Sequence, residues 1–142
     1  MQIRLSGHSA YRTQYHIVWI PKYRRRILNS GVVGELSKLF STVLEQMPGV
    51  EMVEKNILID HVHLVIIIPP KYAVSAVVGR MKQHTASHLR KKFAWLHQVY
   101  HDEPVVWSPG YFASTVGIDE DVILRYVRFQ ERQDSGQTKL NL

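Results

Sequence analysis

The stretch Asp60–Pro70, with the sequence DHVHLVIIIPP, constrains the fold more than any other part of the chain. Its leucine and β-branched residues predict a β-strand, which the two prolines end. Because side chains alternate between the two faces of a strand, His61 and His63 share one face. Val65 and Ile67 lie on that same face, and Val62, Leu64, Ile66 and Ile68 lie on the other. Since both faces are mostly apolar, we expect this strand in the middle of a sheet that is covered on both sides.

The histidine pair on this strand suits a metal ion. Two imidazoles that lie roughly 7 Å apart along a rigid strand can turn toward one point and share a cation. The pattern by itself leaves a second interpretation open, in which His61 and His63 are ordinary core or surface residues.

Composition indicates a globular protein with a polyanionic partner. The 142 residues suffice for one domain, which we take as residues 1–142, and the net charge of +6 favours nucleic acid. The absence of cysteine excludes disulfides and thiolate zinc sites. No apolar run approaches the ~20 residues of a membrane helix. The N-terminus lacks an apolar signal segment, so we expect a cytoplasmic protein without a membrane partner.

The remaining pattern predicts an α+β fold. Strands are expected at Tyr11–Ile20, Val50–Leu58 and Tyr111–Val116, and helices at Ser30–Met47, Val74–Leu96 and Glu120–Arg132. Ser30 is expected to cap the first helix, and the acidic residues 119–121 to cap the last one. The chain is polar and expected to be loose from about Asp134. The order gives a ferredoxin-like βαββαβ arrangement with an antiparallel sheet, in which the first and third strands are central, followed by an additional C-terminal helix.

Basic residues gather after the first strand. Lys22-Tyr23-Arg24-Arg25-Arg26 places four cations around one aromatic ring, which suits single-stranded nucleic acid because the ring can stack on a base while the cations hold phosphates. A solvated loop is the alternative interpretation. Arg80, Lys82 and Arg90 lie mostly off the apolar stripe of the second predicted helix, and we expect them to contact DNA as well.

Two further histidine pairs have helical spacing, His84 with His88 and His97 with His101. Residues four apart share a helix face, so each pair could in principle bind zinc. Neither pair has a glutamate after its first histidine, so the metalloprotease signature is absent. We expect these four histidines to be surface residues or phosphate contacts.

Several ordered blocks of the chain resemble the single-tyrosine HUH transposases, the small TnpA type that mobilises minimal bacterial and archaeal insertion sequences. The blocks are YHIVW at 15–19, PKYRR at 21–25, DHVHL at 60–64 running to Pro69-Pro70, WSP at 107–109, Tyr111-Phe112, TVG at 115–117, and Tyr126 with Gln130. Gly110 departs from this pattern, because the family has a small polar residue there. Residues before Tyr11 and after Arg132 lie outside the resemblance.

The resemblance implies a role for each matching residue. His61 and His63 correspond to the metal-binding pair, Tyr126 to the nucleophile, and Gln130 to a third metal ligand on the helix of the nucleophile. The family has the ferredoxin-like fold, acts as a homodimer in the prokaryotic cytoplasm and recognises hairpins in single-stranded DNA. It implies a transposase that cleaves and rejoins DNA through a 5′-phosphotyrosine, with Mg²⁺ or Mn²⁺ as cofactor.

Three alternatives share parts of this pattern. One is an HUH nuclease that acts on chromosomal repeat hairpins, and another is a non-catalytic ferredoxin-like module that binds nucleic acid, as RNA-recognition domains do. The third is a zinc hydrolase built from the histidine pairs of the helices.

Overall fold

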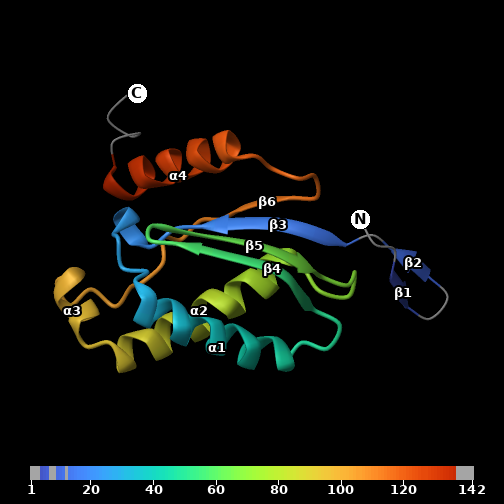
Figure 1. The fold of residues 1–142 in the computed structure, drawn as a ribbon, viewed down its shortest axis with the longest axis horizontal. Coiled ribbons are helices and arrows are strands. Elements are labelled where there is room, and N and C mark those ends of the chain that lie inside the picture. The colour runs from blue at the N-terminus through green and yellow to red at the C-terminus, as the bar shows by residue number, and fades with distance from the viewer. Residues whose placement is uncertain (1–3, 7–8, 12, 137–142) are drawn as a thin grey trace.

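A four-stranded antiparallel sheet forms the centre of the computed structural model, which describes residues 4–6, 9–11 and 13–136, with side chains from residue 13 onward. The strands are β3 (Gln14–Trp19), β4 (Glu51–Leu58), β5 (His61–Ile67) and β6 (Phe112–Ser114), in the spatial order β4-β5-β3-β6. The histidine strand β5 is therefore central, as its two apolar faces predict. This order and the alternation with helices confirm the expected ferredoxin-like α+β fold (Figure 1).

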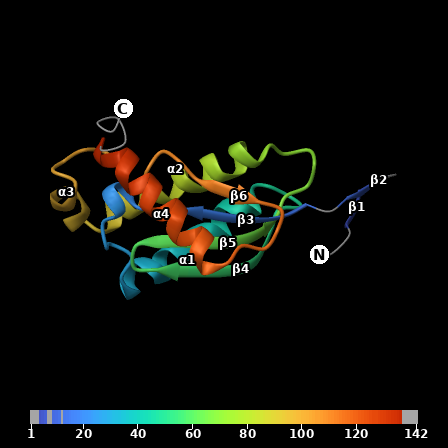
Figure 2. The same ribbon diagram turned by 90° about the horizontal axis from the view of Figure 1, so that it is seen from above.

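Helices cover both faces of the sheet. α1 (Ser30–Glu45) and α2 (Val74–Lys92) lie on one face, and α4 (Glu120–Ser135) lies across the other (Figures 1 and 2). The larger core includes Val62, Leu64, Ile66 and Ile68 together with α1 and α2 residues such as Leu36, Phe40, Val78 and Met81. A smaller core under α4 joins Val18 and Ile20 to Ile123 and Val127. Burial of these two apolar sets therefore decides which way the residues of β5 and β3 face.

The helix boundaries differ from the prediction in two places. Asn29, rather than Ser30, caps α1, because its side-chain oxygen accepts a hydrogen bond from the amide of Val32 at 3.0 Å. The second predicted helix divides in two: α2 ends at Lys92, and Trp95–Val99 forms the separate helix α3. Phe93 leaves the helical conformation and packs with Trp95 against the core. No glycine or proline marks this break, so the sequence pattern did not reveal it.

The N-terminal part forms a hairpin that was not predicted. β1 (Arg4–Ser6) and β2 (Ser9–Tyr11) pair in a separate two-stranded sheet, so Tyr11 belongs to this hairpin and not to the first central strand. Figure 1 shows the hairpin at the end of the molecule opposite α3.

The C-terminal helix is longer than predicted. α4 continues through Asp134 and Ser135 and ends at Gly136, which adopts a left-handed conformation with φ of 79°. The expectation of a loose tail from about residue 134 is therefore wrong for Asp134, Ser135 and Gly136, and residues 137–142 lie outside the described residues. Asp119 caps the helix by accepting a hydrogen bond from Val122, as expected. Within the described part of the chain, no helix has the length and apolar character that crossing a bilayer requires.

Candidate active site

His61 and His63 lie on the face of β5 that is turned toward α4. Antiparallel pairing places His63 directly opposite Val18, which belongs to the small core under α4. His61 is buried, and its Nδ1–H donates to Asp60 Oδ1 at 2.9 Å. This bond leaves the lone pair on Nε2 of His61 free. Carboxylates orient metal-binding histidines in the same way. Burial opposes ionisation of Asp60, but hydrogen bonds from His61 and Arg24 outweigh it and lower the pKa of this carboxyl.

A third imidazole lies beside the pair. The Nδ1 of His16 on β3 is 3.4 Å from the Nε2 of His63, and the ring centroids are 5.6 Å apart. Burial, and then the neighbouring His16, lower the pKa of His63, so His63 is neutral at pH 7 and keeps a lone pair for a metal. His16 was not among the predicted site residues, although its position opposite Val65 follows from the pairing register of the two central strands.

Arg24 connects the histidines to α4. Its guanidinium donates to Asp60 at 2.9 Å and to Glu131 of α4 at 3.0 Å. Arg24 was expected to contact DNA, but these two ion pairs occupy it within the fold. It therefore supports the carboxylate that orients His61.

Tyr126 is half-buried in the middle of α4. Its ring packs on Phe112 of β6 with centroids 5.9 Å apart. Its hydroxyl is buried and has no hydrogen-bond partner among the described residues. Burial, and then the charge of Asp134, raise the pKa of this phenol, so it is protonated at neutral pH in this conformation.

Gln130 lies one turn further along α4 and is also buried. Its amide nitrogen donates to Asp134, and its amide oxygen lies beside Gly110. Tyr126 and Gln130 thus share a face of α4, as their spacing predicts, but this face is turned toward β6 and the segment before it. β3 lies between β6 and the histidine strand. In residues 13–136, no hydrogen bond or ring contact joins Tyr126 or Gln130 to His61 or His63.

The basic segment after β3 forms a short 3₁₀ turn, η1 (Lys22–Arg24), that packs against the C-terminal end of α4. Arg25 and Arg26 are exposed, and the Arg25 guanidinium lies 5.7 Å from the centre of the Tyr23 ring. A cavity of about 450 Å³ lies between η1 and α4, lined by Tyr23, Arg25, Arg128, Glu131, Arg132 and Ser135. Arg128 and Arg132 were not predicted to contact DNA, although their spacing of four residues places them on one helix face.

We expect the cavity between η1 and α4, which we call the basic groove, to bind the phosphates of single-stranded DNA. Replacing Arg25 and Arg132 together by Ala should weaken DNA binding. It should also make the slope of log K against log salt concentration less negative, by about 0.7 for each phosphate that the protein no longer neutralises. Fluorescence anisotropy at a series of salt concentrations measures both quantities. Lys38→Ala provides the control, because Lys38 is exposed on α1, on the opposite face of the sheet. An unchanged salt slope in the double variant would show that the groove does not hold DNA.

The expected DNA contacts of α2 have different surroundings. The ammonium of Lys82 donates to the carbonyl oxygens of Ser108 and Gly110 at 2.6 and 2.9 Å, and burial lowers its pKa to about 8. The structure therefore does not support Lys82 as a DNA contact, because its charge holds the segment before β6 in place. Arg80 is exposed and donates a hydrogen bond to the side-chain oxygen of Gln46. The Nη2 atom of Arg90 lies 3.3 Å from Nδ1 of His97.

The helix histidines form no metal centre. The rings of His84 and His88 are tilted by 41° with their centroids 4.3 Å apart, and Nδ1 of His88 bonds to the carbonyl oxygen of His84. His97 lies in α3, but His101 follows the end of that helix with a positive φ, so the expected helical pairing of these two is wrong. Within the described residues, no three histidine, aspartate or glutamate side chains are grouped to hold a metal. The metal site expected from His61 and His63 differs from such a group, because its third ligand is the side-chain amide of Gln130.

The fold is the one that the resemblance in the sequence implies, and comparisons with known proteins identify the family. The family described as "Transposase IS200 like" matches residues 9–130. The transposase of insertion sequence IS200 from Salmonella typhimurium is 30% identical over 139 residues, covering 96% of this chain and 88% of the relative. The ISDra2 transposase TnpA of Deinococcus radiodurans is 26% identical over 125 residues, covering 87% of this chain and 88% of the relative.

Solved structures show the same fold. A crystal structure assigned as a transposase from Deinococcus radiodurans R1 superposes with a TM-score of 0.78 at 25% identity, covering 89% of this chain and 97% of the other. A tyrosine transposase bound to a REP hairpin superposes with a TM-score of 0.54 at 14% identity, covering 94% of this chain and 74% of the other. This chain belongs to the IS200-like transposase family.

Proposed function

We propose that this transposase cleaves and rejoins single-stranded DNA by metal-assisted transesterification, with Tyr126 as the nucleophile. The observation that carries the proposal is the arrangement of His61 and His63 on one face of the central strand, with Asp60 orienting His61. A histidine that only fills the core needs no ionised carboxylate at its Nδ1. The matched family region, residues 9–130, includes the four residues of the proposed site, which are His61, His63, Tyr126 and Gln130.

The donor atoms of the proposed site fit Mg²⁺ or Mn²⁺. His61, His63 and Gln130 would hold the cation through two neutral imidazoles and one amide oxygen, a set that suits Mn²⁺ better than Mg²⁺ and leaves positions for phosphate and water. When bound, the cation would polarise a non-bridging phosphate oxygen and orient the phosphate for in-line attack.

The residues of the chain account for the remaining steps. Tyr126 attacks phosphorus as its phenol loses a proton, the bond from phosphorus to the 3′-oxygen breaks, and that oxygen takes up a proton. The products are a 5′-phosphotyrosine and a DNA 3′-hydroxyl. A second 3′-hydroxyl then attacks the same phosphorus, joins the two DNA ends and releases the phenol. Each step exchanges one phosphoester for another, so strand transfer needs neither ATP nor water.

We further propose that two protomers assemble each site. The Tyr126 and Gln130 face of α4 is turned toward β6, and β3 separates it from the histidines of the same chain. An α4 presented to the histidines of a second copy would complete the site, and a dimer would supply two nucleophiles for two DNA ends. We propose DNA hairpins near the element ends as its ligands, since a related fold is described in complex with a REP hairpin.

Replacing His61 or His63 by Ala tests this function. Each variant should lose Mn²⁺-dependent formation of a detergent-resistant protein–DNA adduct, measured with single-stranded DNA from the genomic flanks of the gene. Each should keep a cooperative melting transition, because the site is separate from the two apolar cores. His88→Ala is the control and should keep full activity, since His88 is exposed on α2. Adduct formation by the His63 variant at the wild-type rate would exclude the metal role.

A nuclease that acts on chromosomal repeat hairpins would use the same chemistry. The 30% identity to the IS200 transposase over 96% of this chain favours the transposase. A non-catalytic module that reads RNA on its sheet is disfavoured, because the chain belongs to the IS200-like transposase family.

A further inference from the structure

A second cavity shares part of its wall with the basic groove. Its volume is about 340 Å³, and it is lined by Tyr23, Arg25, Val99, Tyr100, His101 and Glu103. We call it the α3 cavity, because α3 and the loop that follows it form one wall, while η1 and the residue after it form the other. Tyr23 and Arg25 also line the basic groove, so the two cavities adjoin at these side chains.

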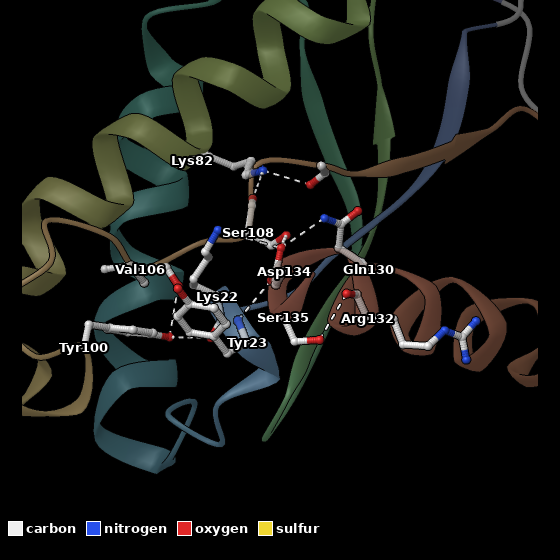
Figure 3. Close-up of polar contacts among 11 residues, drawn as sticks. Lys22, Tyr23, Lys82, Tyr100, Val106, Ser108, Gln130, Arg132, Asp134 and Ser135 are labelled. Atoms are coloured by element: carbon white, nitrogen blue, oxygen red, sulfur yellow. Dashed lines mark hydrogen bonds and ion pairs between the residues drawn. The ribbon is translucent and has the colours of Figure 1, made fainter. Parts of the chain in front are cut away.

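Hydrogen bonds fix the two walls of the α3 cavity relative to each other. The Tyr100 hydroxyl donates to the carbonyl oxygens of Lys22 and Val106, both at 3.2 Å (Figure 3). The backbone N–H of Lys22 also donates to the Val106 carbonyl at 2.8 Å. η1 is therefore tied to both ends of the loop that runs from Tyr100 to Val106. A cavity whose walls are already in place has little ordering to complete when it takes up a ligand.

Both walls also contain strained backbone. Tyr23 and Arg24 have φ of 60° and 56°, and His101 and Asp102 have φ of 51° and 64°. In the described part of the chain, these four are all of the residues other than glycine that have a positive φ. Side chains make this conformation costly, and such residues gather at functional sites, where the fold holds them in place. The strain therefore indicates that the positions of these two segments matter for function.

Two opposite charges line the α3 cavity without bonding to each other. The side chains of Arg25 and Glu103 are exposed, and within residues 13–136 neither forms a hydrogen bond or an ion pair. The guanidinium of Arg25 thus has free donors, and the carboxylate of Glu103 has free acceptors. A ligand between them would have to present acceptors to one side and donors to the other.

Glu103 distinguishes the α3 cavity from a phosphate site. The carboxylate in the basic groove, Glu131, is paired with Arg24 at 3.0 Å, but Glu103 has no such partner and would repel a phosphate. A nucleobase carries no charge and offers N–H groups that a carboxylate can accept. The rings of Tyr23 and Tyr100 provide aromatic surface, on which unstacked bases of a single strand bind. The cavity therefore suits a base of a strand whose phosphates lie in the basic groove.

Guanine matches both charges. Its N1–H and N2–H₂ groups are adjacent donors that one carboxylate can accept together, and its O6 and N7 are the acceptor pair that arginine binds. Adenine, cytosine and thymine each have one donor group on the Watson–Crick edge, with an acceptor beside it. A carboxylate that faces these bases therefore meets an acceptor as well as a donor.

We propose that the α3 cavity binds one unpaired guanine of single-stranded DNA, and that Glu103 is the residue that selects it. Arg25 would contact the acceptor edge of the same base. The inference rests on the proposed function, in which single-stranded DNA is the substrate. It assigns to this chain a base-specific contact outside the histidine and tyrosine residues of the proposed active site.

Binding to short oligonucleotides tests the assignment. The probes are an oligothymidine of about 12 nucleotides and the same strand with one central base replaced by guanine, adenine, cytosine or hypoxanthine, none of which can form a hairpin. Fluorescence anisotropy of the full-length protein in EDTA measures affinity without cleavage. The guanine strand should bind at least about tenfold more tightly than the thymine, adenine and cytosine strands. Hypoxanthine lacks the 2-amino group of guanine and should lose most of this gain.

Glu103→Gln should remove the preference for guanine. Glutamine has one acceptor and one donor group in place of two acceptors, so it cannot accept both guanine donors. The ratio of the affinities for the guanine and thymine strands should fall to about one, whatever the variant does to DNA binding in general. Glu45→Gln is the matched control, because it removes the same charge from an exposed position on α1 and should keep the wild-type ratio. Thermal melting should be unchanged in both variants, since both side chains are exposed.

The outcomes separate this inference from the proposed function. Equal affinity of the wild type for the guanine and thymine strands would overturn the guanine site and leave single-stranded DNA as the substrate. A guanine preference that persists in Glu103→Gln would place the selection elsewhere and overturn the role of the α3 cavity. Failure of the wild type to bind any of the strands would contradict both the inference and the proposed function.

Discussion

Replacing Tyr126 by Phe should abolish the covalent protein–DNA adduct and at the same time make the protein more stable. The hydroxyl is buried and has no partner among the described residues, and leaving such a group unpaired costs about 1–3 kcal/mol. The ring contact with Phe112 does not need the hydroxyl and should persist. We expect a higher melting temperature, by about 2–4 °C for each kcal/mol gained. DNA affinity should change little, because the phenol acts in the chemical step.

Tyr100→Phe is the matched control for Tyr126→Phe. Tyr100 is also buried, but its hydroxyl donates to the carbonyl oxygens of Lys22 and Val106, both at 3.2 Å (Figure 3). This variant should lose about 1 kcal/mol of stability and keep its cleavage activity. A covalent adduct in the Tyr126 variant would show that another residue is the nucleophile. A lower melting temperature of the Tyr126→Phe variant would show that the Tyr126 hydroxyl forms a hydrogen bond in the folded protein.

The two tyrosines also predict the behaviour at alkaline pH. Burial raises the pKa of both phenols above the value of about 10 for a free tyrosine. The folded state therefore favours the neutral phenol. Ionisation of these phenols therefore leaves stability unchanged below pH 10 and lowers it as the pH rises from 10 toward the higher pKa of the folded state. Each Phe variant should show a smaller loss of stability above pH 10 than the wild type, which chemical denaturation at a series of pH values can measure.

The central part of the fold could be predicted because its patterns are local. The alternation of β5 follows from residues 61–67 alone, and pairing with β3 shows that the face shared by His61 and His63 is the one turned toward Val18 and α4. The expected strand order, with β3 and β5 in the centre, is confirmed as well. Each of these features depends on which side chains are apolar, and the sequence shows that directly.

The features that were not predicted depend on contacts between distant residues. Asp134 follows the last apolar turn of α4 and carries no helix signal, yet it is buried because the backbone of Tyr23 and the hydroxyl of Ser108 donate to it. Lys82 has the appearance of a surface cation, but its partners are carbonyl groups in a segment 26 and 28 residues away. The break at Phe93 arises from packing against the core. No local periodicity encodes such partners.

Mixing two inactive variants should restore cleavage if each site is built from two protomers. Tyr126→Phe chains keep the histidines, and His63→Ala chains keep the tyrosine. In a dimer that contains one chain of each kind, a site formed between protomers joins the intact histidines to the intact tyrosine. Random pairing makes half of the dimers mixed, with one complete site in each, so about a quarter of the wild-type sites should form adduct. Quantifying the adduct after co-expression of the two chains measures this fraction.

This expectation follows from the direction in which α4 turns the face that carries Tyr126 and Gln130. The ring of Tyr126 rests on Phe112, the oxygen of Gln130 rests beside Gly110, and β3 separates both from the histidine strand. Neighbouring strands lie about 4.8 Å apart, so two strand spacings separate β6 from β5. A site within one chain would require α4 to turn its buried face across β3, and then the mixture would stay as inactive as either variant alone. A chain that carries both substitutions, mixed with Tyr126→Phe, is the control and should give no adduct, because no protomer then supplies a tyrosine.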